Sequence, residues 1–168
     1  MDEKQFIKLL TEFSNELKLS GFAVFGCNDE QIRLLEAKHG NLPQFYKIFL
    51  KFIGIDAGDF QTGTTISYID LNNINRKTLE RMHKNNIIPA GNIFTFSMYQ
   101  NHTSLFFSDH YQDDPDVYCY DNAHKTTKTG KTFSQYLAAE FNKYRNANAF
   151  LYSYIAKIAP PSTTAFVR

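Results

Sequence analysis

The hydrophobic positions between residues 42 and 53 repeat at the spacing of an α-helix that is apolar on most sides. Pro43 suits a first helical turn, and Gly54 provides the stop. A helix without a broad polar face is normally buried between other elements. The pattern therefore predicts a central helix in a single core. Its apolar positions are Phe45, Tyr46, Ile48, Phe49, Phe52 and Ile53.

Two amphipathic helices are expected before the central one. Apolar residues recur at helical spacing from Phe6 to Leu17. Asn28 and Gln31 have the spacing of a capping box, in which each side chain bonds to the backbone N–H of the other residue. The second helix is thus predicted to begin after Asn28 and to end at Gly40.

Further helices are expected in the C-terminal half, where Asn and Thr residues precede helically spaced apolar positions. They are predicted from Asn72 or Asn73 to Lys84, from Thr132 to Tyr144, and, after a break near 146–148, from 150 to 158.

Short runs rich in β-branched and aromatic residues predict strands that follow one another closely. They begin near Thr64 (TTISYIDL) and cover residues 93–99, 104–107 and 116–121, and the tract 122–131 is expected to be a polar loop. Such a series favours an α+β fold with a mainly antiparallel sheet of about four to six strands. The N-terminal helices and a C-terminal helical segment would pack around it. One domain is expected over residues 1–159, with a tail at 160–168 after two prolines.

Composition narrows the functional classes. The 168 residues carry a formal net charge of +1, so no global charge attracts nucleic acid or an anionic membrane. Cys27 and Cys119 are far apart in apolar or strand-like contexts, which predicts free thiols. The N-terminus lacks the order of a signal peptide, and no apolar run is long enough for a membrane span. A cytoplasmic protein is therefore expected.

No motif indicates catalysis. Gly130-Lys131-Thr132 matches the end of a phosphate-binding loop, but Lys125 stands where that loop needs a glycine. The histidines lack the spacing of a metal site, although His102 or His124 joined by folding to Asp109-His110 and Asp113-Asp114 would supply ligands. We therefore expect the histidines to lie at the surface, and we expect no catalytic residue, metal or cofactor.

Aspartates and tyrosines are concentrated between residues 109 and 121, where no Lys or Arg occurs. Carboxylates steer the approach of a basic protein, and tyrosines supply rigid contact area. The alternative is a solvated loop in which the aspartates act as turn residues. Two further aspartates lie on the glycine turn after the central helix. The predicted partner-binding residues are Asp56, Asp59, Asp109, Tyr111, Asp113, Asp114, Asp116 and Tyr118.

The order of these signals resembles the SUKH superfamily, which includes bacterial immunity proteins and a yeast regulator of cell-wall synthesis. The resemblance extends over roughly residues 28–145 and includes the turn at 88–91, the later strands and the helix after Thr132. It rests most directly on an acidic helix followed by a Leu-Pro helix start. The matching positions are Glu36, Leu42, Pro43, Tyr46, Lys47, Phe49 and Leu50.

The resemblance implies an α+β fold and a function without catalysis. It implies an immunity protein that binds a cognate polymorphic toxin domain, often a nuclease or a deaminase. The segment from Asp109 to Tyr120, rich in aspartate and tyrosine, would then cover a basic cleft of the toxin together with Asp56 and Asp59. Direct contact with nucleic acid or a membrane is not expected, and the oligomeric state is left open. The alternatives are a regulatory protein-interaction scaffold and, less favoured, an enzyme that uses His102, Asp109 and His110.

Overall fold

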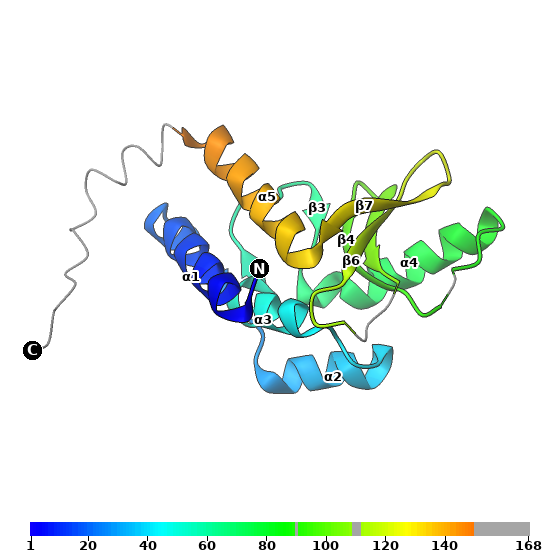
Figure 1. Ribbon diagram of the computed structural model, residues 1–168, viewed down its shortest axis with the longest axis horizontal. Coiled ribbons are helices and arrows are strands. Elements are labelled where there is room, and N and C mark those ends of the chain that lie inside the picture. The colour runs from blue at the N-terminus through cyan, green and yellow to red at the C-terminus, as the bar shows by residue number, and fades with distance from the viewer. Residues whose placement is uncertain (90, 109–111, 150–168) are drawn as a thin grey trace, which may run out of the picture.

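A five-stranded antiparallel meander is the frame on which the helices pack (Figure 1). The computed structural model describes residues 1–89, 91–108 and 112–149, which form one α+β domain. The sheet has the order β3 (Thr64–Thr65), β4 (Phe94–Tyr99), β5 (Thr103–Phe107), β6 (Asp116–Tyr120), β7 (Thr126–Thr132). A separate two-stranded ribbon pairs β1 (Val24–Phe25) with β2 (Asp56–Ala57). The expected antiparallel sheet is confirmed.

The helices lie on both faces of this sheet. Their bounds are α1 (Glu3–Leu19), α2 (Asp29–His39), α3 (Gln44–Ile53), α4 (Leu71–Lys84) and α5 (Phe133–Ala147), and a 3₁₀-turn, η1 (Tyr68–Asp70), precedes α4. Figure 1 shows α1 and α5 on one side of α3, with α2 along its lower edge and α4 extending beside the sheet. Among the described residues, no helix is both long and apolar enough to cross a membrane.

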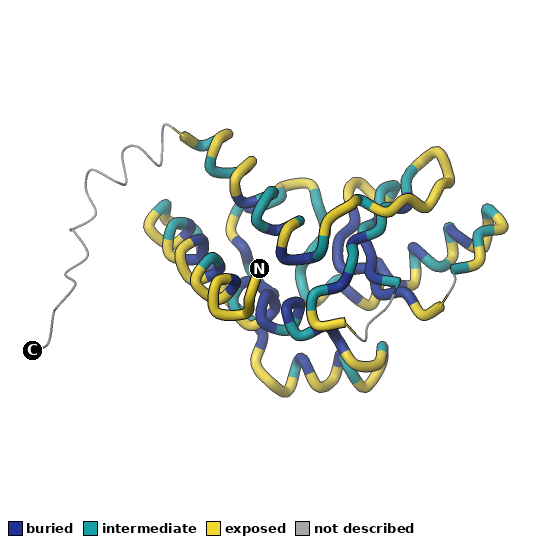
Figure 2. The backbone as a smooth tube through the Cα atoms, viewed as in Figure 1, coloured by how far each residue is buried: buried dark blue, intermediate teal, exposed yellow. Residues whose placement is uncertain are grey.

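Helix α3 lies at the centre of the core, as its apolar pattern predicts (Figure 2). Tyr46 is fully buried, and its ring contacts Phe94, Phe107 and Phe133 with centroid distances of 5.4, 5.5 and 5.4 Å. These partners come from β4, β5 and α5. Tilted and edge-on aromatic pairs at this spacing are attractive beyond the area they bury. One ring of α3 therefore joins the sheet to the C-terminal helix.

Helix α4 covers the opposite face through buried polar contacts. Successive strand residues point to opposite faces, so Thr95 faces α4 where Phe94 faces α3. The Asn75 side chain donates to the Thr95 carbonyl at 2.8 Å and accepts from the Thr95 N–H at 2.7 Å. Thr78 and Ser104 share a 2.8 Å hydroxyl bond. The two Asn75 bonds satisfy the Thr95 backbone of β4 beside the irregularity in its pairing with β5.

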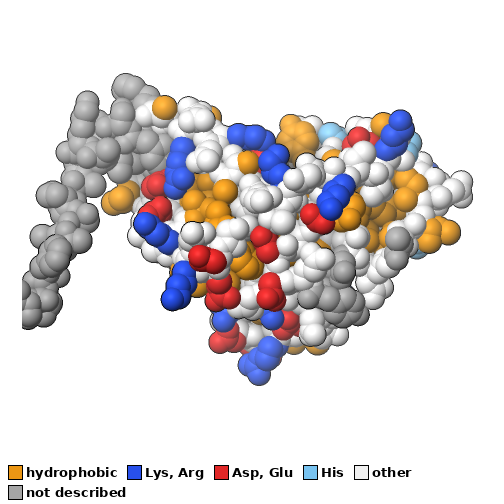
Figure 3. Space-filling view, viewed as in Figure 1, with side chains coloured by type: hydrophobic (Ala, Val, Ile, Leu, Met, Phe, Trp, Pro, Cys, Tyr) orange, Lys and Arg blue, Asp and Glu red, His pale blue; other side chains and the backbone are white. Residues whose placement is uncertain are grey.

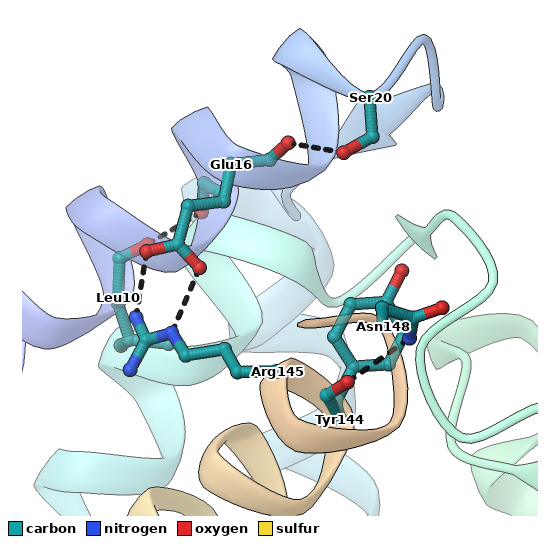
Figure 4. A network of polar contacts seen from close by, with 7 residues as sticks. Leu10, Glu16, Ser20, Tyr144, Arg145 and Asn148 are labelled. Carbon is teal, nitrogen blue, oxygen red and sulfur yellow. Dashed lines mark hydrogen bonds and ion pairs between the residues drawn. The ribbon is translucent and has the colours of Figure 1, made fainter. Parts of the chain in front are cut away.

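An ion pair joins α1 to α5 (Figure 4). The Arg145 guanidinium of α5 donates to both carboxylate oxygens of Glu16 in α1, at 2.8 and 2.9 Å. Its carbon also lies 5.8 Å from the centre of the Phe13 ring. Bidentate Arg–carboxylate pairs fix orientation as well as distance. The pair therefore adds an oriented polar contact to the stacking of Phe13 on Phe141 between α1 and α5.

Most of the predicted helix ends are confirmed. Asn28 and Gln31 form the capping box of α2, with reciprocal bonds of 2.8 and 2.9 Å. Gly40 ends that helix with a φ of 85°, a backbone conformation that favours glycine. Thr132 precedes α5, and its N–H donates to Gln135 at 3.1 Å. These short polar motifs therefore predicted the helix ends correctly.

Three predictions about local structure are wrong. The tract 122–131 is not only a loop, because β7 forms there as an exposed edge strand paired with β6. The strand at Thr64 is only two residues long, because Tyr68 N–H donates to the Gly54 carbonyl at 2.7 Å and draws the chain away from β4. Helix α4 begins at Leu71, so Asn72 and Asn73 lie inside its first turn. Leu71 is fully buried, and this burial outweighs the capping preference of asparagine.

Two of the predictions near the C-terminus lie outside the described residues. They are the helical segment at 150–158 and the tail at 160–168. Helix α5 ends at Ala147, within the predicted break. Both cysteines are free thiols, as expected, and Cys27 is buried.

Replacing Tyr46 with Phe is expected to stabilise the fold. The Tyr46 hydroxyl is buried and has no hydrogen-bond partner among the described residues, and burial raises its pKa well above the usual value. An unpaired buried hydroxyl costs free energy, so its removal should increase the free energy of unfolding by about 1 kcal/mol. Urea unfolding measures the change.

Tyr136→Phe is the matched control. The Tyr136 hydroxyl accepts a 3.2 Å bond from the Gln61 amide, so its loss should lower stability by about 1 kcal/mol. If Tyr46→Phe were equally destabilising, the Tyr46 hydroxyl would have a partner, such as a buried water.

Candidate functional site

The bend at Gln112–Asp114 is anchored to the start of α3. Pro43 precedes this helix and gives it no side-chain cap. The Phe45 N–H, which has no partner within the helix, donates instead to the Asp113 carbonyl at 3.0 Å. The Asp113 side chain is exposed, near the positive end of the helix dipole. The structure therefore presents this predicted residue to solvent on a fixed backbone.

Asp114 has a structural role at the start of α5. Its two carboxylate oxygens accept from the Ser134 N–H at 2.8 Å and from the Ser134 hydroxyl at 2.7 Å. The adjacent Pro115 carbonyl accepts from the Phe133 N–H at 2.9 Å. Asp114 is half-buried between these groups. Its carboxylate oxygens are thus engaged by the helix that they cap.

The next aspartate and tyrosines are also engaged within the fold. Asp116 accepts from the Lys128 ammonium at 2.6 Å, and this hydrogen bond raises the pKa of Lys128. Tyr118 is half-buried and stacks on Phe106 with a centroid distance of 5.7 Å. Tyr120, part of the same acidic tract, is fully buried. Asp109 and Tyr111 lie outside the described residues.

Asp56 and Asp59 lie near the other end of α3. Asp56 accepts from the Gly58 N–H at 2.9 Å, and Asp59 accepts from the Tyr144 hydroxyl of α5. The ten residues of α3 separate this turn from the bend at Asp113, a length of about 15 Å. Among the described residues, the structure therefore does not join the predicted aspartates into one continuous cluster.

A groove between α2 and α3 leads to Asp113 and was not predicted. Two cavities of about 330 and 320 Å³ share Glu36, Gln44 and Lys47, and the second extends to Gln112 and Asp113. We call this surface the α2–α3 groove. Figure 3 shows acidic and basic side chains interspersed over this part of the molecule. Glu36 and Lys47 can be read from the sequence, but the sequence analysis used them only as evidence of a family resemblance and did not predict a groove.

Glu36 links the two helices that form the groove. Its Oε1 lies 3.3 Å from the Lys47 ammonium and accepts from the Leu42 N–H at 3.1 Å. Farther along, the Lys51 ammonium binds Asp29 at 2.8 Å and lowers the pKa of that carboxyl. Gln44 donates to Glu3 of α1 at 3.4 Å. The lining of the second cavity thus holds two carboxylates, those of Glu36 and Asp113, and one cation, Lys47.

The described residues contain no arrangement that favours catalysis. They include no group of three or more metal-ligating side chains, and burial raises the pKa of the Cys27 thiol to about 11, which disfavours the reactive thiolate. Gly130-Lys131-Thr132 lies in β7 rather than in a loop around a phosphate. His102 contacts Thr103 at 3.0 Å and His39 contacts Asn72 at 2.7 Å, and both histidines are half-buried.

Comparison with known proteins gives one family. The model of the SMI1 / KNR4 family (SUKH-1) matches residues 26–139, which is more than half of the chain. This range includes α2, α3, the whole five-stranded sheet and the first part of α5. No curated protein and no solved structure gives a significant match.

Asp114→Ala is expected to destabilise the fold, whereas Asp113→Ala is not. The first change leaves the Ser134 N–H and hydroxyl without their partner, and loss of such a cap costs about 1–2 kcal/mol. The second removes only an exposed carboxylate and keeps the backbone carbonyl that Phe45 requires. Urea unfolding of both variants measures the difference, and equal effects would contradict the assigned roles.

Proposed function

The chain belongs to the SMI1/KNR4 family (SUKH-1), and on this premise we propose that it is an immunity protein that binds and neutralises a cognate bacterial toxin domain. The family includes toxin immunity proteins, and its domains are generally non-catalytic immunity or regulatory domains. The family match is the observation that carries the proposal, because it extends over most elements of the fold.

The charge at the Asp113 end of the α2–α3 groove supports a partner with a basic surface. In the second cavity, Glu36 and Asp113 contribute two carboxylates, and Lys47 contributes one cation. A toxin that acts on nucleic acid needs a basic cleft to hold phosphates. Complementary charge of this kind speeds encounter and disfavours wrong partners. The proposed toxin is therefore a nuclease or deaminase domain whose basic cleft meets this groove.

The backbone around Asp113 suits such a role because it is held in place before binding. The Asp113 carbonyl is bound to α3, and the Asp114 carboxylate and the Pro115 carbonyl are bound to α5. A contact surface that is already ordered loses less conformational entropy on association. Asp113 is thus a favourable contact residue, supported by neighbours that maintain its position.

Affinity capture of the tagged chain from cells that naturally make it should retain one stoichiometric partner. Expression of that partner alone in a bacterial host is expected to stop growth, and co-expression of this chain is expected to restore growth. A partner that is harmless alone, or whose toxicity the chain does not relieve, would contradict the immunity function and favour a regulatory scaffold.

Asp113→Lys should slow association with the captured toxin by about tenfold at low ionic strength, because it reverses charge at the groove. The dependence of the association rate on salt should weaken as well. Stopped-flow or surface-binding kinetics at several salt concentrations measure both effects.

Glu80→Lys is the matched control for the charge reversal. Glu80 is exposed on α4, where it binds Arg76 at 2.7 Å, and it lies outside the α2–α3 groove. Its association rate should stay close to that of the unmodified chain. If both variants slowed association equally, net charge rather than the groove would determine the rate.

A further inference from the structure

A second cleft lies between β2 and β3, two short strands that belong to different sheets. The cleft has a volume of about 360 Å³, and its walls come from the chain between Ile55 and Ser67 together with Asp70. Among the described strands, β2 pairs only with β1, and β3 pairs only with β4. Each strand therefore keeps one side without a neighbouring strand.

The lining of the cleft combines acidic groups with apolar surface. Asp56 and Asp70 are its only charged residues, and no Lys or Arg lines it. Asp56 uses Oδ1 to accept from the Gly58 N–H, and the Asp70 carboxylate makes no capping bond to α4. Apolar side chains complete the lining together with hydroxyl and amide groups. The apolar members are Ile55, Ala57, Phe60 and Ile66.

Ile55 lines this cleft, and two further exposed hydrophobic residues neighbour its lining, Phe25 across the ribbon and Ile69 next to Asp70 in the chain. Phe25 is 60% exposed, Ile55 is 38% exposed and Ile69 is 82% exposed. Phe25 pairs with Asp56 across the ribbon, and the Tyr68 N–H bond to Gly54 brings η1 beside the same turn. Large exposed apolar side chains grouped around a polar depression are typical of a protein-binding surface.

We propose that this cleft accepts a Lys or Arg side chain from a protein partner, with Phe25, Ile55 and Ile69 contacting the partner around it. Long basic side chains bury their aliphatic stems against apolar groups and keep the charged end among acceptors. The apolar walls suit the stem, and the Asp56 and Asp70 carboxylates suit the ammonium or guanidinium group. A phosphate-bearing ligand is disfavoured, because both charged groups in the lining are acidic.

The partner's identity rests on the proposed function, but the chemistry of the cleft does not. A basic toxin surface would supply the side chain, and the cleft would be an anchor apart from the α2–α3 groove. Pockets that enclose one long side chain are common centres of binding energy in protein interfaces. The cleft thus adds a specific contact to the more general charge attraction of the groove.

The cleft can be tested on the full chain without any toxin. Titration with n-butylguanidinium, followed by amide NMR shifts, should give saturable changes at Gly58, Gln61, Thr64 and Ser67. The uncharged probe 1-pentanol should give none, and Asp56→Asn with Asp70→Asn should weaken the guanidinium affinity at least fivefold. Absence of saturable shifts, or shifts unchanged in the double variant, would overturn the proposal.

The second test uses the captured toxin. The same double variant should bind it at least tenfold more weakly, mainly through faster dissociation. Glu80→Gln on α4 is the control for loss of an exposed carboxylate outside the cleft. Both aspartate changes keep the size of the side chain, and an unchanged melting temperature confirms folding.

The outcomes separate the two proposals. If the unmodified chain neutralises a toxin and the double variant binds it equally well, the cleft proposal fails and the immunity function stands. If guanidinium binds in the cleft but no toxin is neutralised, the cleft proposal stands and the immunity function fails.

Discussion

The burial of the wide apolar surface of α3 is the constraint on which the rest of the structure depends. Six of its ten residues are buried, so it needs cover from several directions. Helices α1, α2 and α5 and strands β4 and β5 supply that cover, and Tyr46 contacts rings from three of these elements. A helix with so wide an apolar surface, interrupted only on the side of Gln44, Lys47 and Lys51, gains its stability from this packing rather than from its own propensity. The positions of the surrounding elements follow from the shape of this one helix.

The same constraint explains which features were predictable from the sequence. The helices α1, α2, α3 and α5 have periodic apolar positions, and the caps at Asn28 and Thr132 use local bonds that a short motif encodes. Strand β7 has no such signal. Its residues are polar and mostly exposed, since an edge strand buries little and often carries lysine. The early end of β3 depends on the bond from Tyr68 to Gly54, fourteen residues earlier, and no local pattern reports such a contact.

The candidate site shows a similar division. A run of aspartates predicts an acidic surface, but the sequence alone does not distinguish a carboxylate that caps a helix from one that faces solvent. Asp113 and Asp114 are adjacent, yet one is exposed and the other binds Ser134. The difference arises because Asp113 contacts α3 through its backbone carbonyl, whereas Asp114 contacts α5 through its side chain. Ser134 of α5 lies about twenty positions after Asp114 in the chain, so the local sequence does not show this contact. Glu36 and Lys47 were visible as a pattern, but only the fold shows that they form a groove that leads to Asp113.

These structural roles make the acidic surface more suitable for binding rather than less. A mobile acidic loop would pay a conformational cost for each side chain that it orders on a partner. Here the Asp113 carbonyl caps α3, Asp114 caps α5, and Asp116 holds β7 through Lys128. The same segment that connects the central helix, the C-terminal helix and the sheet edge therefore also fixes the exposed carboxylate. Stability of the core and placement of the Asp113 charge depend on one set of hydrogen bonds, so a change that loosens the core is expected to weaken recognition as well.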